Sequence, residues 1–484
     1  MINRRIFITI MVCSCVWSTY AQSLEEQFRA FRQSAKADYT SFRDNANQKY
    51  ADFMRGAWEY YKSAPAIPMP QEEPVPPVIF EEQQQEQEDQ EIIIEEVVTP
   101  LAPQPQPQPF EPIKPSPKPR PNICQFNYFN TACEAHMPER LMRLSAASND
   151  AFANGWEVLS NGEYDATLAD GLKLREQLSL CDWAYLLLLY ELSETAYQAS
   201  CNEAILLCAW LYCQSGYQMR LALDGQRLHL LFASEHAIYG QPYFELDGYN
   251  YYTLAPVSEN IQICTAAFEN EQALSLYVPH YPHLQQNYSD TRLLQAEYFK
   301  DMHVSVQTNR NLIAFYDTYP SSELNNNPLT RWAMYANTPL TDEMRQNIYP
   351  YLAQQLKGNT YRAAVEQLLN FVQTAFVYEY DDKVWGGDRA FFAEETLYYP
   401  YADCEDRSIF FSRLVRDLLE LPVILVYYPG HLATAVAFPQ AEQGDYILLN
   451  EQRFTICDPT YIGAPVGATM PNMNNQTAQV ILLQ

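Results

Sequence analysis

The feature that most limits how this chain can fold is a proline-rich segment at residues 63–121. Half of the 32 prolines of the 484-residue chain lie there, together with the acidic run "EEQQQEQEDQE". Such a composition buries too little apolar surface to form a core, and its proline-rich end favours an extended, stiff chain. We therefore predict a linker. Two apolar islands within it, "PVIF" and "EIIIEEVV", are candidates to add a strand to a neighbouring sheet edge.

The first 21 residues have the layout of a cleaved secretory signal peptide. Arg4 and Arg5 precede the apolar run "IFITIMVCSCVW", and Ala21 ends a short polar stretch. Cleavage after Ala21 is favoured over lipidation of Cys13 or Cys15, because "MVCSC" is a poor lipidation motif. We expect an exported protein, periplasmic or extracellular, that contacts a membrane only if it is lipidated.

Residues 22–62 show an eleven-residue period of aromatic side chains. Phe28, Tyr39, Tyr50 and Tyr61 follow one another at this interval. Eleven residues complete close to three helical turns, so the pattern predicts one long amphipathic helix with an aromatic stripe. The stripe has to be covered, either by later parts of the same chain or by a second copy. Docking and self-association both remain open.

The remainder of the chain reads as globular, and the chain as a whole is strongly acidic. A formal net charge of -28 argues against nucleic acid as a partner, because binding to phosphates needs positive charge. Hydrophobic residues make up 48% of the chain, which is enough for sizeable cores. We expect a helical plus β domain at 122–283, a connecting region at 284–360 and an α+β domain at 361–484.

Beyond the signal peptide nine cysteines remain, an odd number that leaves at least one thiol unpaired within the chain. Cys124 and Cys133 are candidates for a disulfide, which in an exported chain is more economical than a zinc site with His136. His280 and His283 in "PHYPH" have no further ligand cluster, so a loop is expected there. We predict no metal and no cofactor.

One cysteine stands at the start of an amphipathic run. "CEDRSIFFSRLVRDLLEL" predicts a helix with Asp403 as N-cap and with Glu405 and Asp406 in its first turn. Cys404 would then lie at the positive end of the helix dipole, which favours the thiolate and lowers the thiol pKa. The carboxylates act in the opposite direction, so a second cationic group is needed to hold a thiolate.

The elements that follow supply His431 as the candidate for this cationic group. "VILVYY" and "HLATAVAF" are predicted strands joined by a turn at Pro429-Gly430, and a further hairpin ends in "CDPTY". Cys404, His431 and Asp458 therefore each lie at the end of a regular element. A nucleophilic thiol needs a base within reach and a third group that orients the base. The alternative for Cys404 is a buried, inert thiol.

The motifs "ADCEDRS", "PGHLATAV" and "CDPTY", in this order and spacing, resemble the transglutaminase-like superfamily, whose fold is papain-like. The resemblance covers residues 363–465. It implies that Cys404 is the nucleophile, His431 the general base and Asp458 the orienting acid. Ala402 departs from the pattern, since many members have glycine two residues before the cysteine.

An acyl-transfer site also needs donors for the oxyanion. The backbone N–H of Cys404 is one candidate, because it lies at a helix start. A side-chain donor upstream could be Gln373 or Trp385, and the sequence leaves this choice open.

The earlier globular region repeats the layout. "SCNEAILLCAWLYC" begins at Cys201, and His229 follows at nearly the spacing that separates His431 from Cys404. Where Asp458 would fall, the chain offers Ala255 or Pro256. Residues 122–283 are therefore interpreted as a possible degenerate transglutaminase-like domain, and an unrelated helical domain is the alternative.

These observations predict an exported bacterial cysteine enzyme that acts on amide bonds by acyl transfer through a thioester. Peptidase or amidase activity is preferred over cross-linking, because bacterial proteins that resemble this superfamily are often peptidases. The substrate would be a protein or peptide in the cell envelope or outside the cell. The alternative is a non-catalytic envelope scaffold or binding protein built on degenerate domains.

Overall fold

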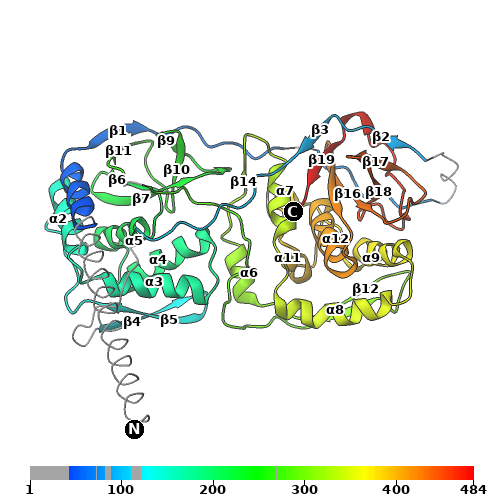
Figure 1. The fold of residues 1–484 in the computed structure, drawn as a ribbon, viewed down its shortest axis with the longest axis horizontal. Helices are drawn as coiled ribbons and strands as arrows, with labels where there is room; N and C mark the ends of the chain where they lie inside the picture. The colour runs from blue at the N-terminus through cyan, green and yellow to red at the C-terminus, as the bar shows by residue number, and fades with distance from the viewer. Residues whose placement is uncertain (1–42, 72, 82–88, 111–121, 269) are drawn as a thin grey trace, which may run out of the picture.

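The computed structural model describes residues 43–71, 73–81, 89–110, 122–268 and 270–484. The predicted signal peptide lies outside these residues, and so does the predicted N-terminal helix before residue 43. The fold is α+β, with two lobes side by side that each combine helices with a sheet (Figure 1). Among the described residues, no helix combines the length and the apolar character needed to cross a bilayer.

The N-terminal lobe is built on a six-stranded antiparallel sheet with the order β1-β11-β6-β7-β10-β9. Its strands are β1 (Trp58–Lys62), β6 (Met219–Asp224), β7 (Arg227–Ser234), β9 (Phe244–Leu246), β10 (Tyr249–Thr253) and β11 (Asn260–Cys264). The predicted turn at Asp247-Gly248 joins β9 to β10, and both residues have the positive φ of 53° and 83° that a tight hairpin turn requires.

Helices cover one face of this sheet. They are α2 (Asn149–Leu159), α3 (Asp165–Gln177), α4 (Asp182–Tyr197) and α5 (Asn202–Gln214). The side chains of α5 are buried almost all round, because α4 packs on one side of it and the sheet on the other. A separate hairpin, β4 (Asn122–Tyr128) and β5 (Thr131–Met137), closes the lobe against α3 and α4.

The C-terminal lobe holds a seven-stranded sheet with the order β2-β17-β18-β16-β15-β19-β3. Its strands are β2 (Glu91–Ile92), β3 (Glu96–Val98), β15 (Val423–Tyr428), β16 (His431–Ala437), β17 (Tyr446–Leu449), β18 (Gln452–Cys457) and β19 (Gln479–Leu482). Its helices are α8 (Asp342–Leu356), α9 (Tyr361–Ala375), α10 (Asp381–Val384), α11 (Ala393–Tyr398) and α12 (Cys404–Leu419). The central helix α12 packs on β15 and β16, as its apolar face predicts.

Short elements connect the lobes. They are β8 (Ala237–Ile238), β12 (Arg292–Gln295), β13 (His303–Val306), α6 (Arg310–Tyr316), β14 (Ser322–Glu323) and α7 (Thr330–Asn337). The helix α7 packs against α12 and β19, while β14 pairs with β8 of the N-terminal lobe. One hydrophobic cluster therefore continues from the N-terminal lobe to Cys404 and Ile409.

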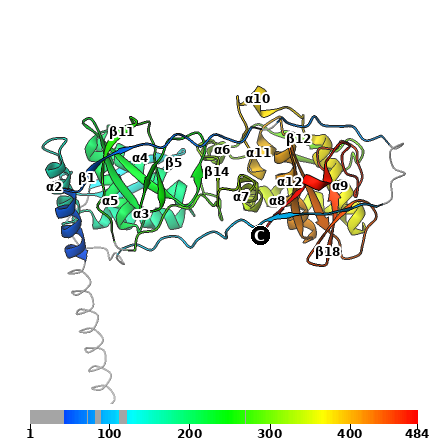
Figure 2. The same ribbon diagram turned by 90° about the horizontal axis from the view of Figure 1, so that it is seen from above.

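The segment predicted as a linker is bound along both lobes. We call its described residues between 63 and 110 the strap; residues 63–80 are its outgoing limb and residues 99–110 its return limb. Figure 2 shows the two limbs running along opposite sides of the molecule. Between them, β2 pairs with β17 and β3 with β19, both in parallel, so the predicted strand addition by "EIIIEEVV" is confirmed. The other island, "PVIF", makes only an isolated bridge from Ile79 to Ile462.

The prediction of one helix over residues 22–62 is wrong at its C-terminal end. Helical residues 43–54 are followed by a turn at Gly56 and then by β1, which pairs with β11. The aromatic residues of β1 suit a sheet edge, and glycine breaks the helix before them. Tyr50 is buried against Phe268, with ring centroids 4.7 Å apart, whereas Phe53 is 66% exposed. This part of the helix thus docks on its own chain, and self-association stays a prediction.

Six strands of the C-terminal sheet have the topology of the six-stranded N-terminal sheet, and β2, next to β17, has no counterpart. Read from the edge, β1-β11-β6-β7-β10-β9 corresponds to β3-β19-β15-β16-β18-β17, and the strands after each central helix follow in the same chain order. In both lobes a helix, α5 or α12, leads into a central hairpin with a two-residue turn. The outermost strand differs, because β1 is antiparallel to its neighbour and β3 is parallel.

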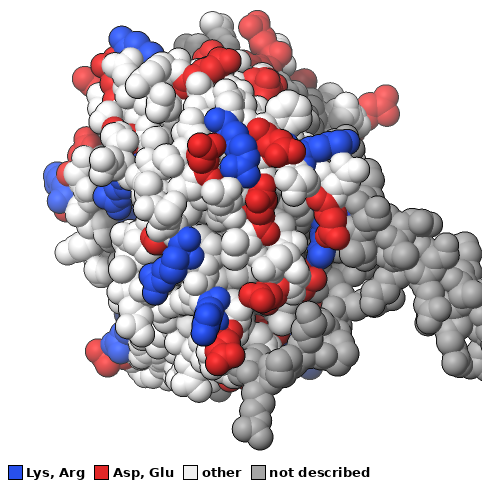
Figure 3. All heavy atoms as spheres, turned by 90° about the vertical axis from the view of Figure 1, so that its left-hand side faces the viewer, with Lys and Arg blue, Asp and Glu red and all other residues white. Residues whose placement is uncertain are grey.

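The surface and the cysteines add two observations. At the end of the N-terminal lobe, acidic and basic side chains are interspersed (Figure 3), so the excess negative charge is not concentrated on that face. All nine described cysteines are free thiols. The predicted disulfide between Cys124 and Cys133 is wrong, because Cys124 faces Ala135 across the hairpin and Cys133 faces Phe126. His136 binds the Asp170 carboxylate instead, at 2.5 Å.

Candidate active site

Cys404 is the first residue of α12, and Asp403 is its N-cap, as predicted. The Asp406 carboxylate fixes this helix start, because it accepts hydrogen bonds from the backbone N–H groups of Asp403 at 3.3 Å and Phe391 at 2.8 Å. Cys404 is only 5% exposed, yet it lines a pocket of about 620 Å³ together with His431. The helix start therefore presents the thiol to a pocket rather than to the core alone.

The sheet brings His431 and Asp458 together. His431 opens β16, and Asp458 directly follows β18, which pairs antiparallel with β16. His431 Nε2 lies 2.8 Å from Asp458 Oδ2, and both side chains are buried. The second oxygen of Asp458 accepts hydrogen bonds from the backbone N–H groups of Thr460 and Tyr461, at 2.8 and 3.2 Å. The carboxylate is thus fixed on both sides and can orient the imidazole.

The other ring nitrogen of His431 is left without a partner. Nδ1 is buried and finds no hydrogen-bond partner among the described residues. A neutral imidazole whose Nε2–H donates to a carboxylate has its lone pair on Nδ1. This nitrogen is therefore the one that could accept a proton from a nearby thiol.

Gln373, one of the two predicted oxyanion donors, has a different role. Its Nε2 donates to the backbone carbonyls of Asp458, Tyr461 and Ala464, at 3.1, 2.7 and 3.2 Å. Its Oε1 accepts a hydrogen bond from Gly463 N–H at 3.1 Å. Gln373 is therefore a positioning residue for the loop that carries Asp458, and its predicted role as an oxyanion donor is wrong for this arrangement.

Trp385, the other candidate, packs beside the pocket without lining it. It is 36% exposed, lies edge-on to Tyr399 at a centroid distance of 4.8 Å, and carries Arg389 over its face at 4.4 Å. The glycines that follow it, Gly386 and Gly387, do line the pocket. The donor that remains is the backbone N–H of Cys404, since the first N–H groups of a helix have no acceptor within the helix.

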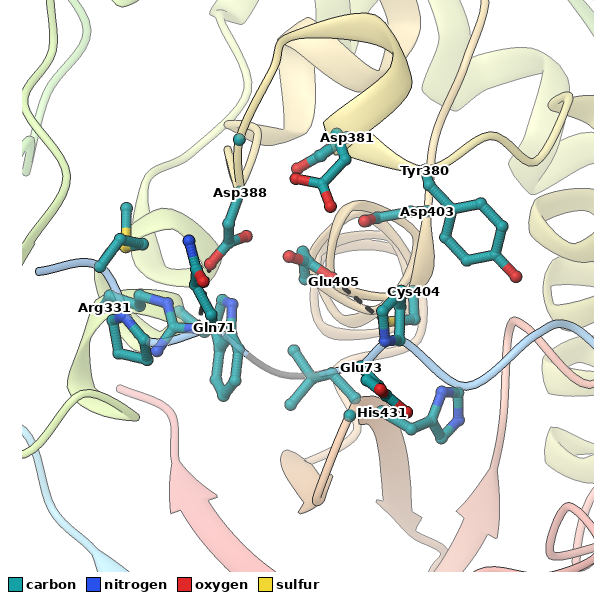
Figure 4. A pocket seen from close by; sticks show the side chains of 18 of the residues that line it. Gln71, Glu73, Arg331, Tyr380, Asp381, Asp388, Asp403, Cys404, Glu405 and His431 are labelled. Atoms are coloured by element: carbon teal, nitrogen blue, oxygen red, sulfur yellow. Dashed lines mark hydrogen bonds and ion pairs between the residues drawn. The ribbon is translucent and has the colours of Figure 1, made fainter.

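The Cys404 thiol does not engage His431 in this conformation. Among the described residues, the thiol donates to Glu405 Oε2 at 3.1 Å and makes no hydrogen bond to the imidazole (Figure 4). Burial raises the pKa of Cys404 well above its ordinary value, and the negative charges of Glu405 and Asp403 raise it further. A hydrogen bond from Leu432 N–H lowers the pKa by less.

The predicted lowering of the Cys404 pKa by the helix start is therefore wrong for this conformation. A helix N-terminus contributes about half a positive charge, whereas burial and the neighbouring carboxyl groups of Glu405 and Asp403 act against the thiolate here. The sequence did indicate the opposing carboxylates, but burial could not be judged from it.

Carboxylates surround the thiol from two segments. Asp381 and Asp388 from the segment around α10, and Asp403 and Glu405 from the start of α12, line the same pocket (Figure 4). Burial raises the pKa of Asp381 to about 7. Burial and the charge of Glu405 raise the pKa of Asp388 to about 7 as well. The sequence reasoning missed Asp381 and Asp388; their position on either side of a Gly-Gly pair was the available signal.

Several of these groups could hold a divalent cation. The ligand atoms of Asp403, Cys404 and Glu405 lie within 4.8 Å of one another, and two further carboxylate triads overlap them. The triads are Asp381, Asp403 and Asp406, and Asp381, Asp388 and Glu405. Oxygen-rich sets of this kind suit hard cations, and equally an ammonium or guanidinium group.

Positive charge near the thiol is scarce. Among the described residues that line the pocket, Arg331 is the only lysine or arginine; it lies 3.3 Å from Asp388 and over the ring of Trp332 at 3.9 Å. Arg407 is fully buried behind the site and donates to three backbone carbonyls. These belong to Ala402, Gln373 and Phe376. Arg407 thus holds the chain that leads into Cys404.

No family model, curated protein or solved structure matches this chain. The assignment of the site therefore depends on its own geometry and on the resemblance of its motifs.

The N-terminal lobe contains other residues at the corresponding places. Asn202 is the first residue of α5, as Cys404 is of α12. Arg227 pairs with Asp224 across the hairpin turn, as His431 pairs with Tyr428. Cys201 precedes the helix and His229 lies two residues inside β7, so their predicted equivalence to Cys404 and His431 is wrong.

Continuing the two registers places Ala255 where the C-terminal lobe has Asp458. The Asn202 side chain ties the helix start to the hairpin: its Oδ1 accepts from Leu228 N–H at 2.9 Å, and its Nδ2 donates to Gln226 O at 2.8 Å. In the C-terminal lobe the backbone of the corresponding residue, Leu432, acts on the Cys404 thiol instead and lowers its pKa. The same backbone contact thus serves an amide in one lobe and a thiol in the other.

Proposed function

We propose that the C-terminal lobe is a cysteine acyl-transfer site of the transglutaminase-like, papain-type class, and that it acts on amide bonds. The observation that carries the proposal is the buried His431–Asp458 pair, at 2.8 Å, together with the fact that His431 and Cys404 line the same pocket. Base and orienting acid come from strand ends and the nucleophile from a helix start, which is the arrangement that a thiol nucleophile needs.

In the proposed reaction, the thiol leaves Glu405 and turns toward His431. Nδ1 of His431 takes the thiol proton while Asp458 stabilises the imidazolium through Nε2. The thiolate attacks the amide carbonyl, and the Cys404 backbone N–H is placed to stabilise the oxyanion. As the C–N bond breaks, His431 returns the proton to the leaving amine. Water then attacks the thioester and releases the carboxylic acid and the free thiol.

Hydrolysis is the preferred outcome, which makes the protein a peptidase or amidase. Attack by an amine instead of water would give cross-linking, and the same three residues would serve it. We place the substrate, a protein or peptide, in the cell envelope or outside the cell, because the sequence begins with the pattern of an export signal.

A second candidate is a non-catalytic scaffold of the cell envelope. It is favoured by the hydrogen bond of the Cys404 thiol to Glu405 and by the raised pKa of that thiol, both of which describe a thiol at rest. In this alternative both lobes would serve binding alone.

A covalent probe separates the two candidates. The full chain is treated with an epoxysuccinyl peptide of the E-64 type, and the adduct is located by peptide mass spectrometry. An adduct on Cys404 is expected in the native protein and in Cys201→Ala, and its loss is expected in Cys404→Ala and in His431→Ala. A native protein that acquires no adduct, or an adduct that forms equally fast in His431→Ala, would contradict the enzyme and leave the scaffold.

A further inference from the structure

The outgoing limb of the strap crosses the catalytic pocket. Five of its residues line the pocket that also contains Cys404 and His431; these are Met69, Pro70, Gln71, Glu73 and Pro74. Figure 4 shows Gln71 and Glu73 among the side chains around the thiol and the imidazole. A segment more than 300 residues away in the sequence therefore forms one wall of the site.

Backbone hydrogen bonds hold this limb on both sides of the pocket. On the N-terminal lobe, Gly240 N–H donates to Ile67 O at 2.8 Å. On the C-terminal lobe, Ile462 N–H donates to Val78 O at 2.9 Å. Between these anchors, Val75 N–H donates at 2.9 Å to the carbonyl of Gly430, the residue directly before His431. The strap is thus bound to the turn that carries the general base.

The turn is shaped to receive the strap. Gly430 has a φ of +77°, and a Cβ added to it would lie 2.3 Å from the backbone oxygen of Glu73. Only glycine permits this approach, because real Cβ atoms are not found so near another atom. The strap backbone therefore lies against the residue next to His431, where an extended chain bound at the site would also have to pass.

Part of the pocket wall is aromatic. Trp332 and Tyr427 line the pocket, and their ring centroids are 5.4 Å apart. Proline-rich chains bind aromatic grooves because they are already extended and lose little conformational entropy. Pro70 and Pro74 of the strap line the same pocket as these rings.

Charge does not favour the strap in this place. Glu73 enters a pocket lined by the carboxylates of Asp381, Asp388 and Glu405, with Arg331 as the only lysine or arginine among the described lining residues. The strap is therefore held by its backbone hydrogen bonds in a pocket whose charges do not attract Glu73. A contact of this kind can be displaced by a chain that makes the same backbone bonds without the acidic side chain.

We propose that strap residues 69–71 and 73–75 are an internal occupant of the substrate groove, and that an extended, proline-bearing polypeptide competes with them for it. The competitor would take the Gly430 carbonyl and the Trp332–Tyr427 surface. The inference rests on the proposed function for the chemistry, and it names the substrate class as an extended polypeptide rather than a small amide.

The test compares two electrophiles on strap variants of the full chain. Val75→Pro removes the N–H that binds Gly430, and Gln104→Pro introduces the same residue into the exposed return limb as a control. We expect Val75→Pro to raise the rate at which an epoxysuccinyl peptide modifies Cys404 by about fivefold, the worth of one backbone hydrogen bond. Iodoacetamide, which is small, should change less, and Gln104→Pro should match the native protein.

Two further measurements keep the test independent of how well the variant folds. A fluorescent peptide with the sequence of residues 68–77, "PMPQEEPVPP", should bind Val75→Pro more tightly than the native protein, and a scrambled peptide should bind neither. In the native protein, modification of Cys404 by the epoxysuccinyl peptide should speed hydrogen exchange in residues 69–71 and 73–75 and leave residues 99–110 unchanged.

The outcomes separate this inference from the proposed function. His431-dependent labelling of Cys404, with equal peptide-electrophile rates in native and Val75→Pro protein and no peptide binding, would overturn the strap as occupant and leave the enzyme. Peptide that binds Val75→Pro more tightly than the native protein, without any labelling of Cys404, would keep the groove and overturn the enzyme. If Cys404 is not labelled and the peptide does not bind, both the enzyme and the strap as occupant are overturned.

Discussion

The two lobes have the same order of strands and a similar central helix, yet they place different chemistry at the same three points. The C-terminal lobe has Cys404 at the helix start, while the N-terminal lobe has Asn202. Asn202 uses both polar atoms of its side chain to tie the helix to the hairpin. The scaffold therefore stays intact without a nucleophile, because its packing depends on the apolar residues of the helix and the strands rather than on these end positions.

The hairpin and the following strand show the same contrast. His431 and Asp458 form a buried pair in the C-terminal lobe. Arg227 and Ala255 stand at the corresponding positions of the N-terminal lobe. An arginine cannot act as a base near neutral pH, and alanine cannot orient one. The comparison teaches that the fold alone predicts no activity here, and that the residues at the ends of its elements decide it.

Replacing the orienting acid should have the largest effect. Asp458→Asn keeps the shape of the side chain but removes the charge that fixes the imidazole, so the rate at which a peptidyl epoxide modifies Cys404 should fall by about 100-fold or more. The matched change in the other lobe, Ala255→Asp, should leave that rate unchanged. Equal rates in native protein and Asp458→Asn would remove the functional difference between the lobes.

The helix-start residue should matter for stability in one lobe and much less in the other. Asn202→Ala removes two hydrogen bonds to the hairpin and should lower the free energy of unfolding of the N-terminal lobe by about 1–3 kcal/mol. Cys404→Ala should change that of the C-terminal lobe by less than about 1 kcal/mol. Native-state hydrogen exchange of α5 and α12 measures both, and similar losses in the two variants would show that Cys404 is also a structural residue.

The acidic neighbour of the nucleophile should slow the thiol. Glu405→Gln removes a negative charge and replaces the carboxylate that accepts the thiol hydrogen bond with a neutral amide, so it should lower the pKa of Cys404 and raise its alkylation rate at pH 8 by roughly threefold to tenfold. Glu203 occupies the second position of α5, as Glu405 does in α12, and Glu203→Gln serves as the control. An unchanged rate in Glu405→Gln would mean that burial alone keeps the thiol at rest.

The smallest effect concerns pH. The pKa of Asp388 is raised to about 7 by burial, so the folded lobe binds more protons than the unfolded chain between roughly pH 4 and pH 7. Stability should therefore fall as pH rises through this window, by on the order of 1 kcal/mol for this group. Thermal unfolding measured at pH 5 and at pH 8 should show a smaller fall in stability between these pH values in Asp388→Asn than in the native protein. Asp382 is exposed, so Asp382→Asn should lose as much stability between pH 5 and pH 8 as the native protein does.

Local patterns predicted much of the C-terminal lobe. The apolar spacing after Cys404 and the alternating strands that follow define α12 and β15 to β18 at the expected residues. The N-cap at Asp403 was visible for the same reason, because capping depends on neighbouring residues only. His431 and Asp458 lie at strand ends, so antiparallel pairing was enough to suggest that they meet.

Features that depend on distant parts of the chain were missed. Nothing near residues 69–71 and 73–75 indicates that they cross the pocket, because their anchors at Gly430 and Ile462 are supplied by the other end of the sequence. Gln373 was judged by its place before Cys404, while its partners are Asp458 and residues that follow it. In the N-terminal lobe, a register shift of one residue separated Cys201 from the helix-start position that Asn202 holds.

The central claim is that Cys404 is activated by His431, whereas Cys201, the residue before α5 in the other lobe, is an ordinary thiol. Cys201 is partly exposed and Cys404 is buried, so simple accessibility favours labelling of Cys201. The most direct measurement is the alkylation rate of each cysteine at pH 7.5 by quantitative peptide mass spectrometry, in native protein and in His431→Ala. We predict that the rate of Cys404 falls at least about 100-fold in His431→Ala, as for the loss of a general base, while that of Cys201 stays the same. A Cys404 that reacts at the same rate in both proteins, or only after unfolding, would contradict the account.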